Sequence, residues 1–336
     1  MEETIVKIIA YGIRDDEMPY LKQWSKDKGI EVKAVAALLD ESTVDQAKGY
    51  DGAVVYQQKP YTASVLDKLA SFGIKSLSLR NVGVDNVDAD AIKRNDIKVT
   101  NVPAYSPSAI AELAVTQLMR LLRQTNTFDR KIAHGDLRWA PTIAKELDQM
   151  TVGVIATGRI GRKVINICRG FGAKIIGYDV YHNPELEKDG IYVDTLDELY
   201  AKADVITVHS PATKENEHML NDAAFGKMKD GVFIINAARG VLVDTDALIR
   251  ALDSGKVAGA ALDVYEDEVG IFNTDFGSFD AIPDERLKNL IKRENVLVTP
   301  HVAFYTETAV KNMVQYALNS NVNLIEKGSD DSQVKF

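Results

Sequence analysis

Three residues with ionisable side chains each follow a short apolar run in the second half of the chain. Arg239 lies in NAARG, Glu268 in DVYEDE and His301 in TPHVAF. Histidine titrates nearest to neutral pH, so His301 could donate a proton to an oxygen that becomes negatively charged during a reaction. Glu268 could favour and orient the imidazolium, and the planar guanidinium of Arg239 could hold a carboxylate, with Gly240 allowing close approach. The three residues together predict general acid catalysis on a substrate that carries a carboxylate.

Each of these residues also has a purely structural interpretation. A lone histidine more often has a structural role, Glu268 belongs to an acidic run at 266–268, and Arg239 could form an ordinary ion pair. The other histidines lie in polar, surface-like segments or flank a loop that could contact a cofactor: His134, His182, His209 and His218. His301 is therefore our candidate proton donor.

The segment from Thr151 to Asp179 predicts a strand, a tight turn, a helix and a second strand. Residues 156–161, ATGRIG, occupy the frame of the G-x-G-x-x-G turn that binds dinucleotides. Gly158 is expected to let backbone N–H groups approach a pyrophosphate, and Gly161 to let the helix pack closely on its strand. Ala156 replaces the first glycine, and because its Cβ disfavours positive φ we expect an altered turn with an ordinary negative φ.

Asp179 ends the second strand of this segment, eighteen residues beyond Gly161. A carboxylate there can accept both ribose hydroxyls of an adenosine and would repel a 2′-phosphate, and no arginine follows to compensate. The sequence therefore predicts NAD as cofactor in preference to NADP, and hydride transfer to a ketone as the reaction that His301 would assist. The alternative is a βαβ unit that binds no ligand.

Composition excludes several other classes of protein. The 336 residues are 46% hydrophobic, enough for two domains, and the net charge of −9 argues against a surface that binds nucleic acid. The single Cys168 excludes an intrachain disulfide and suits a reducing, cytoplasmic location. No pattern typical of a zinc or P-loop site occurs, so no metal is expected. No segment approaches transmembrane length, so we expect no membrane association.

Strands and helices alternate along most of the chain, which predicts parallel α/β architecture. In the first part, strands are expected at residues 5–11, 31–35, 52–56, 76–79 and 97–101, with helices near 15–28, 44, 63 and 89 between them. In the second part, further strands are expected at 152–155, 174–178, 204–209, 232–236, 257–264 and 295–299.

Two helices and one arm connect these parts. A helix from Ser106 to Gln124 is apolar on nearly every face, so it must be buried, and we place it at the junction between domains. A less regular arm over 125–150 could reach a partner subunit. The C-terminal helix, 306–326, carries one apolar stripe and is expected to cover the first domain.

These elements predict an α/β fold with two Rossmann-like or flavodoxin-like parallel-sheet domains. The nucleotide-binding domain, 104–301, would be inserted into a discontinuous substrate domain, 1–103 and 302–336. Ligands of open parallel sheets lie beyond the carboxyl ends of the strands, so the cleft between the two domains is the expected site.

At ATGRIG, Asp179, NAARG, DVYEDE and TPH the chain resembles the NAD-dependent D-2-hydroxyacid dehydrogenases, over essentially its whole length. The segments AYGIRDDE, GAVVYQQ, LRNVGVDN and NVPAYSP look like the D-lactate dehydrogenases of lactic acid bacteria. The resemblance implies the split domain order, a homodimer, and a catalytic set in which Arg239 holds the substrate carboxylate, Glu268 supports the histidine and His301 exchanges the proton.

The resemblance also implies contacts with substrate and cofactor. Tyr56 is similar to the bulky residue that narrows the pocket in lactate enzymes, Phe304 would line the same pocket, and Val82, Gly83 and Tyr105 would contact substrate. Cofactor contacts would come from Gly158, Arg159, Ile160, Gly161, Asp179, Ser210, Pro211, Asn216, Ala237, Ala238 and Asp263. The departures from the family pattern are Ala156 for glycine and Arg159 where relatives often have histidine.

The expected reaction is the reversible reduction of pyruvate to D-lactate by NADH. A first alternative is a D-2-hydroxyisocaproate or phenyllactate dehydrogenase that acts on larger 2-oxo acids. The bulky Tyr56 argues against this alternative. A second alternative is a regulator that senses NAD(H) without turnover. The presence of the complete catalytic set, Arg239, Glu268 and His301, argues against it.

Overall fold

The computed structural model describes residues 6–56, 59–84 and 86–336, which form two compact units. The first unit comprises Met1–Ser106 and Tyr305–Phe336, and the second comprises Pro107–Phe304. Both ends of the chain thus belong to one unit, and the other unit is inserted between them. Ile5 of the first expected strand, Gln57 and Gln58 of GAVVYQQ, and Asp85 of LRNVGVDN lie outside the described residues.

The first unit contains a five-stranded parallel sheet in the order β2-β1-β3-β4-β5, the flavodoxin-like order. Its strands are β1 (Lys7–Tyr11), β2 (Glu31–Val35), β3 (Gly52–Val55), β4 (Ser76–Leu79) and β5 (Lys98–Thr100). Its helices are α1 (Met18–Lys28), the 3₁₀ helix η1 (Val44–Ala47), α2 (Ala63–Ser71), α3 (Ala89–Arg94) and α12 (Glu307–Lys327).

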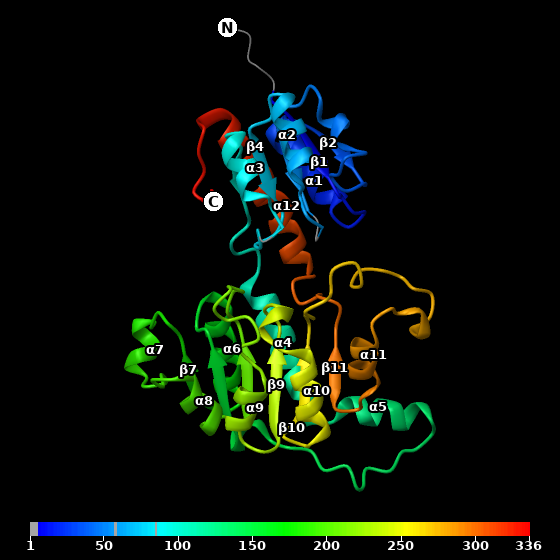
Figure 1. The fold of residues 1–336 in the computed structure, drawn as a ribbon, viewed down its shortest axis with the longest axis vertical. Helices are drawn as coiled ribbons and strands as arrows, with labels where there is room; N and C mark the ends of the chain where they lie inside the picture. The colour runs from blue at the N-terminus through cyan, green and yellow to red at the C-terminus, as the bar shows by residue number, and fades with distance from the viewer. Residues whose placement is uncertain (1–5, 57–58, 85) are drawn as a thin grey trace. The chain divides into compact units, whose positions relative to one another are not determined.

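The C-terminal helix α12 lies against the strands of the N-terminal part, as its apolar stripe predicts (Figure 1). Thr306 caps the helix, because its Oγ1 accepts a hydrogen bond from Ala309 N at 3.3 Å. The fully buried Asn321 then joins α12 to two strands, donating from Nδ2 to the carbonyl oxygens of Ala53 and Ser76 at 3.1 and 3.2 Å. Helix α12 therefore completes the core of the first unit.

The second unit contains a six-stranded parallel sheet in the order β11-β10-β9-β8-β6-β7. Its strands are β6 (Thr151–Ile155), β7 (Lys174–Tyr178), β8 (Val205–Val208), β9 (Val232–Asn236), β10 (Val257–Leu262) and β11 (Val296–Val298). Its α-helices are α4 (Pro107–Leu122), α5 (Thr125–Ala133), α6 (Arg159–Gly170), α7 (Pro184–Lys188), α8 (Leu196–Lys202), α9 (Asp222–Lys227), α10 (Thr245–Asp253) and α11 (Glu285–Lys292). Its 3₁₀ helices are η2 (Leu147–Gln149), η3 (Gly240–Leu242) and η4 (Phe279–Ala281).

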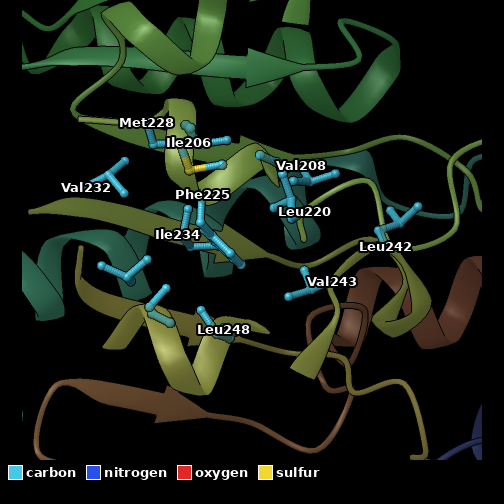
Figure 2. Close-up of a cluster of buried hydrophobic side chains, with 14 of the residues drawn as sticks. Ile206, Val208, Leu220, Phe225, Met228, Val232, Ile234, Leu242, Val243 and Leu248 are labelled. Carbon is cyan, nitrogen blue, oxygen red and sulfur yellow. The ribbon is translucent and has the colours of Figure 1, made fainter. Parts of the chain in front are cut away.

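Helices cover both faces of this second sheet, so its strands are apolar on both sides. On one face α4 and α6 pack on the sheet, and on the other Ile206, Val208 and Ile234 meet the residues of α8, α9 and α10 (Figure 2). Strand β6 has β7 on one side and β8 on the other, so the winding reverses there. The carboxyl end of β6 is thus the switch point at which open α/β sheets bind ligands.

Two local expectations differ from the structure. The helix expected near Val44 is a single 3₁₀ turn, η1, because Gly49 follows it closely at φ 88° and turns the chain toward β3. The arm expected to be irregular over 125–150 begins with a helix, α5, none of whose residues is buried in the single chain. Among the described residues no helix is both long and apolar enough to cross a membrane.

Candidate active site

The structure brings His301 and Glu268 together at the carboxyl edge of the second sheet. His301 follows β11, Glu268 follows the neighbouring β10, and His301 Nδ1 lies 2.6 Å from Glu268 Oε1. The side chains are 28% and 16% exposed, so the pair is largely shielded and its ring nitrogen Nδ1 is occupied. A carboxylate on Nδ1 leaves Nε2 as the nitrogen that can exchange a proton with a substrate.

Arg239 lies in the loop after β9, and this loop packs directly on the loop that carries Glu268. A Cβ added at Gly240 would lie only 2.0 Å from the carbonyl carbon of Tyr265, so glycine is required for this approach. Tyr265 N in turn donates to Glu268 Oε2 at 3.0 Å. The close packing of the two backbones therefore places Arg239 beside the segment that holds Glu268.

Asp263 holds the loop on which His301 lies. Its carboxylate accepts hydrogen bonds from Val302 N at 3.0 Å and Ala303 N at 2.9 Å, and a third from the Thr299 hydroxyl at 2.6 Å. His301 N donates to Asp263 O at 2.7 Å, and His301 adopts a φ of 54°. Burial raises the pKa of Asp263 above its usual range, although the three hydrogen bonds oppose that shift. The residue expected to contact cofactor thus also positions the candidate proton donor.

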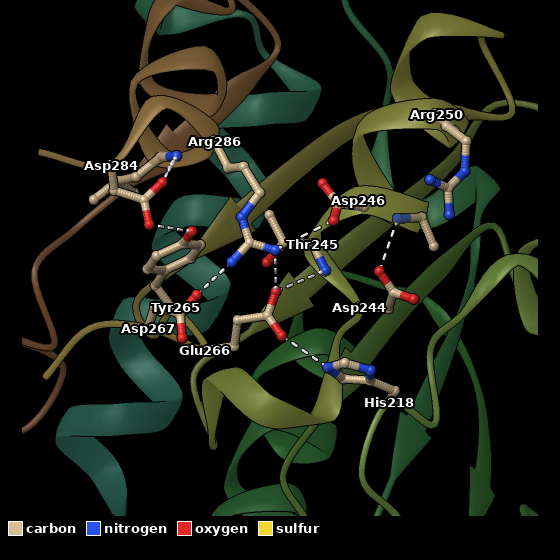
Figure 3. Close-up of polar contacts among 12 residues, drawn as sticks. His218, Asp244, Thr245, Asp246, Arg250, Tyr265, Glu266, Asp267, Asp284 and Arg286 are labelled. Carbon is tan, nitrogen blue, oxygen red and sulfur yellow. Dashed lines mark hydrogen bonds and ion pairs between the residues drawn. The ribbon is translucent and has the colours of Figure 1, made fainter.

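A polar cluster anchors the segment that directly precedes Glu268 (Figure 3). Glu266 accepts from Thr245 N at 3.2 Å and lies 2.7 Å from His218 Nε2 and 3.3 Å from Arg286 Nη1. Arg286 also pairs with Asp267. The sequence assigned Glu266 no role beyond membership of the acidic run at 266–268 and did not reveal this anchor, because His218 and Arg286 are 48 and 20 residues from Glu266.

The turn after β6 corrects the expectation for Ala156. Its φ is 69°, in the left-handed region, and not the ordinary negative value that we expected. The turn is held by its neighbours: Ala156 N donates to Tyr178 O at 2.9 Å, and a Cβ added at Gly161 would lie only 2.2 Å from Ala156 O. Alanine therefore adopts the conformation that the turn imposes, at a cost of about 1–2 kcal/mol.

The groups around this turn fit a dinucleotide. Gly158 caps α6, and a Cβ built there would meet nothing within 4 Å, which leaves open space at the helix N-terminus. Arg159 is exposed at the start of α6, and Ile160 packs partly on the core. The nearby Ser210 Oγ is buried without a hydrogen-bond partner among the described residues. An open helix terminus and a buried hydroxyl with spare bonding capacity are typical of a site for a phosphorylated ligand.

The remaining predicted cofactor residues line the ends of β7, β8 and β9. Asp179 follows β7 and accepts from Thr157 N at 2.6 Å. Asn216 shapes its own loop, because Oδ1 accepts from Thr213 N at 2.7 Å and Nδ2 donates to Pro211 O at 2.8 Å. Ala237 and Ala238 follow β9. His209 lies between β8 and Ser210 with its Nδ1 buried, and this burial lowers the pKa of His209 to about 4 and keeps its ring neutral.

Several of the predicted substrate residues follow strand ends of the first unit. Tyr56 follows β3, and its ring lies 5.4 Å from Arg14 Cζ and 5.9 Å from Arg80 Cζ. After β4, the carbonyl groups of Val82 and Gly83 accept from the side-chain amides of Asn101 and Asn81. Tyr105 O accepts from Asn312 Nδ2 at 2.7 Å, and Phe304 is the half-buried last residue of the second unit.

Comparisons with known proteins identify the family. A family model described as "D-isomer specific 2-hydroxyacid dehydrogenase, NAD binding domain" matches residues 115–303. The chain is 64% identical over 332 residues to a D-lactate dehydrogenase of Lactiplantibacillus plantarum, covering 98% of this chain and 100% of that protein. 

Solved structures show the same fold over nearly the whole chain. A D-2-hydroxyisocaproate dehydrogenase superposes with a TM-score of 0.91 at 44% identity, covering 98% of this chain and 99% of the other. The NAD-complexed D-isomer specific 2-hydroxyacid dehydrogenase of Lactobacillus delbrueckii ssp. bulgaricus superposes with a TM-score of 0.88 at 39% identity, covering 98% and 100%. The expected α/β class with two parallel sheets is confirmed.

Proposed function

This chain belongs to the D-isomer specific 2-hydroxyacid dehydrogenase family, and from that premise we propose that it reduces pyruvate to D-lactate with NADH, reversibly. As a member of the family it is an NAD-dependent oxidoreductase that acts on small 2-hydroxy and 2-oxo acids. We propose that 104–301 is the NAD-binding domain and that 1–103 with 302–336 is the substrate domain. The observation that carries the proposed mechanism is the 2.6 Å contact between His301 Nδ1 and Glu268 Oε1.

In this mechanism the chain supplies a cation, a proton and a negative charge. Arg239 would bind the substrate carboxylate through its planar fork. His301 would donate the Nε2 proton to the substrate oxygen, while Glu268 accepts the Nδ1–H bond and stabilises the imidazolium. The nicotinamide, when bound, supplies the hydride. General acid catalysis contributes about 10²–10⁴-fold, so orientation by Arg239 and the cofactor must supply the remainder.

The cofactor would lie along the ends of β6, β7, β8 and β9. We propose contacts from Gly158, Arg159, Ile160, Gly161, Asp179, Ser210, Pro211, Asn216, Ala237, Ala238 and Asp263. The open space at Gly158 and the buried Ser210 Oγ support these contacts. For substrate we propose Tyr56, Val82, Gly83, Tyr105 and Phe304.

A second candidate activity is the reduction of 2-oxo acids larger than pyruvate. The close superposition on a D-2-hydroxyisocaproate dehydrogenase favours larger 2-oxo acids, whereas the bulky ring of Tyr56, lying beside two guanidinium groups, favours pyruvate. The deciding experiment is NADH oxidation with pyruvate, 2-oxoisocaproate and phenylpyruvate, followed by chiral analysis of the product. Preference for pyruvate with formation of D-lactate supports the proposal, and a higher kcat/KM with either larger acid replaces it. Absence of NADH oxidation with all three would favour an NAD(H)-sensing regulator.

We predict a strong preference for NADH over NADPH. Asp179 follows β7 and would face the adenosine ribose, where its charge repels a 2′-phosphate. The measurement is kcat/KM for the two cofactors at one pyruvate concentration. Equal values, or a preference for NADPH, would contradict the assignment of Asp179.

We also propose that the enzyme is a cytoplasmic homodimer. Three large apolar side chains of the arm after α5 are about four-fifths exposed in the single chain: Leu137 (80%), Trp139 (80%) and Ile143 (84%). Such a cluster on a monomer is typical of a surface that a second subunit covers. The single Cys168 is buried and unpaired, which suits a reducing compartment.

A further inference from the structure

Asp179 is the end of a hydrogen-bond chain that passes through two residues to which neither the sequence motifs nor the proposed mechanism assigns a role. Asp179 Oδ2 accepts from the Thr157 hydroxyl at 3.1 Å as well as from Thr157 N at 2.6 Å. The same hydroxyl lies 2.6 Å from the phenolic oxygen of Tyr192. That phenolic oxygen accepts from Asn183 N at 2.9 Å. This series of hydrogen bonds thus joins the turn after β6 to the segment beyond β7.

The direction of every bond in this chain is determined by chemistry. A backbone N–H only donates, so the Tyr192 oxygen accepts from Asn183. An ionised carboxylate only accepts, so the Thr157 hydroxyl donates its single proton to Asp179. Tyr192 must then donate to the Thr157 oxygen. The donors therefore run in one order, from Asn183 through Tyr192 and Thr157 to Asp179, and no alternative arrangement of protons satisfies all three bonds.

Both intermediate residues are held rigidly. Thr157 is 3% exposed, and its Cγ2 lies 3.2 Å from the position of a Cβ at Gly177, so the absence of that Cβ leaves room for it. Tyr192 forms a parallel bridge with Gly177, which gives it the position of a rudimentary strand beside β7. Its ring stacks on His182 with centroids 4.0 Å apart and planes 2° apart. Moving either hydroxyl out of this series of hydrogen bonds would therefore also disrupt the packing of its side chain.

These hydrogen bonds also determine which oxygen of the Asp179 carboxylate can still accept a bond from a ligand. Oδ2 takes both bonds from Thr157, whereas Oδ1 takes one bond, from Tyr181 N at 3.1 Å. Each carboxylate oxygen has about two lone-pair directions, so Oδ1 has spare accepting capacity. A carboxylate held in this way would leave Oδ1 available to a ribose hydroxyl and would keep its charge in place against a 2′-phosphate.

We propose that Thr157 and Tyr192 are positioning residues that set the preference of this chain for a dinucleotide with a free ribose diol over one with a 2′-phosphate. They act by holding the Asp179 carboxylate in one orientation and touch neither the substrate nor the reacting atoms. The inference rests on the proposed role of Asp179 in binding the ribose. It differs from that role in placing part of the selectivity on two neutral hydroxyl groups.

The test is equilibrium binding of NADH and of NADPH, followed by nucleotide fluorescence, to variants that remove one hydroxyl each. For Thr157→Val we expect Kd for NADH to rise about 5- to 20-fold, because this hydroxyl bonds the Asp179 carboxylate directly. For Tyr192→Phe we expect a rise of about 3- to 10-fold, because the Tyr192 hydroxyl acts on Asp179 only through the neutral hydroxyl of Thr157. Kd for NADPH should stay unchanged or fall. Thr157→Ser keeps the hydroxyl and should restore NADH binding to within about twofold of wild type. At saturating NADH, kcat should be unchanged.

Two further variants separate the possible failures. Tyr200→Phe removes the hydroxyl of another buried tyrosine of the same unit, which donates to Met219 O at 3.4 Å, and should leave both Kd values unchanged. If Asp179→Ala leaves NADH binding intact, the ribose role of Asp179 fails and this inference fails with it. If Asp179→Ala weakens NADH binding but Thr157→Val and Tyr192→Phe do not, the positioning role alone is overturned. Equal weakening of NADH and NADPH with a lower Tm would also overturn it, because that pattern marks a merely structural role.

Discussion

His301 and Ala156, at two strand ends of the candidate site, have backbones in the left-handed region, at φ 54° and 69°. Each lies where the chain leaves a parallel strand and turns sharply. In each case a backbone hydrogen bond holds the conformation, from His301 N to Asp263 O at 2.7 Å and from Ala156 N to Tyr178 O at 2.9 Å. Strain of this kind is tolerated where the surrounding structure imposes it, and it is concentrated at functional sites.

We predict that Ala156→Gly stabilises the protein. Glycine adopts positive φ without strain, which recovers about 1–2 kcal/mol, while its greater freedom in the unfolded chain opposes about half of that gain. The expected result is a Tm higher by about 2–4 °C. The measurement is thermal and urea unfolding, with Ala173→Gly as a control, since Ala173 does not have a positive φ and glycine there should destabilise. An Ala156→Gly variant no more stable than wild type would show that the turn is unstrained.

We predict that His301→Gln lowers kcat by about 10²–10⁴, the usual contribution of a general acid. Binding of NADH should change little, because the variant removes a proton donor and no proposed cofactor contact. The measurement is steady-state turnover of pyruvate beside a fluorescence titration with NADH. His134→Gln, at an exposed position after α5, is the matched control and should behave as wild type. Unaltered turnover in His301→Gln would remove this residue from the mechanism.

At the scale of elements, the site depends on three loops that follow the neighbouring strands β9, β10 and β11. The Arg239 loop packs on the Glu268 loop at Gly240, and Asp263 ties the end of β10 to the loop of His301. The cluster of His218, Glu266 and Arg286 anchors the middle loop through Glu266 (Figure 3). The catalytic side chains are therefore positioned mainly by bonds among backbones and neighbouring loops.

We predict that Gly240→Ala damages both activity and stability. The new Cβ would lie 2.0 Å from a backbone carbon of Tyr265, which cannot move as the end of a flexible side chain could. Forced separation of the two loops should cost about 1–3 kcal/mol of unfolding free energy and lower kcat at least tenfold. The measurements are urea unfolding and pyruvate turnover. Gly170→Ala, where a Cβ meets nothing within 4 Å, should preserve both quantities, and equal behaviour of the two variants would refute the packing argument.

At the scale of the whole molecule, each of the two units has its own sheet and its own buried cores. The chain crosses between them twice, after residues 106 and 304. The exposed apolar arm belongs to the inserted unit, the one that the NAD-binding family model matches. The proposed subunit contact is thus assigned to that unit.

We predict that charge on the arm abolishes the dimer. In Leu137→Glu with Trp139→Glu, two carboxylates replace apolar side chains that the contact would bury, and burying an unpaired charge is strongly unfavourable. Light scattering should give twice the 37.0 kDa chain mass for wild type and a single chain mass for the variant. Tyr316→Glu on α12, where the residue is 51% exposed, is the control and should remain dimeric. A wild-type monomer would overturn the proposal.

Local patterns in the amino-acid order were enough to predict the parallel α/β class, the βαβ unit that ends at Asp179, and the three charged residues after β9, β10 and β11. They are readable because strand and helix periodicity, glycine spacing and strand ends are short-range properties of a chain. The order of residues also predicted the burial of α12 from its stripe at helical spacing.

Contacts between distant segments were readable only from the folded chain. The turn in which Ala156 has its positive φ is bonded to Tyr178 O on another strand and lies close to Gly161 of the helix, where only glycine leaves room for it. Tyr192 meets Thr157 across 35 residues, and His218 meets Glu266 across 48. No periodicity encodes such pairs, because they form between segments that become neighbours only when the strands take their places in the sheet.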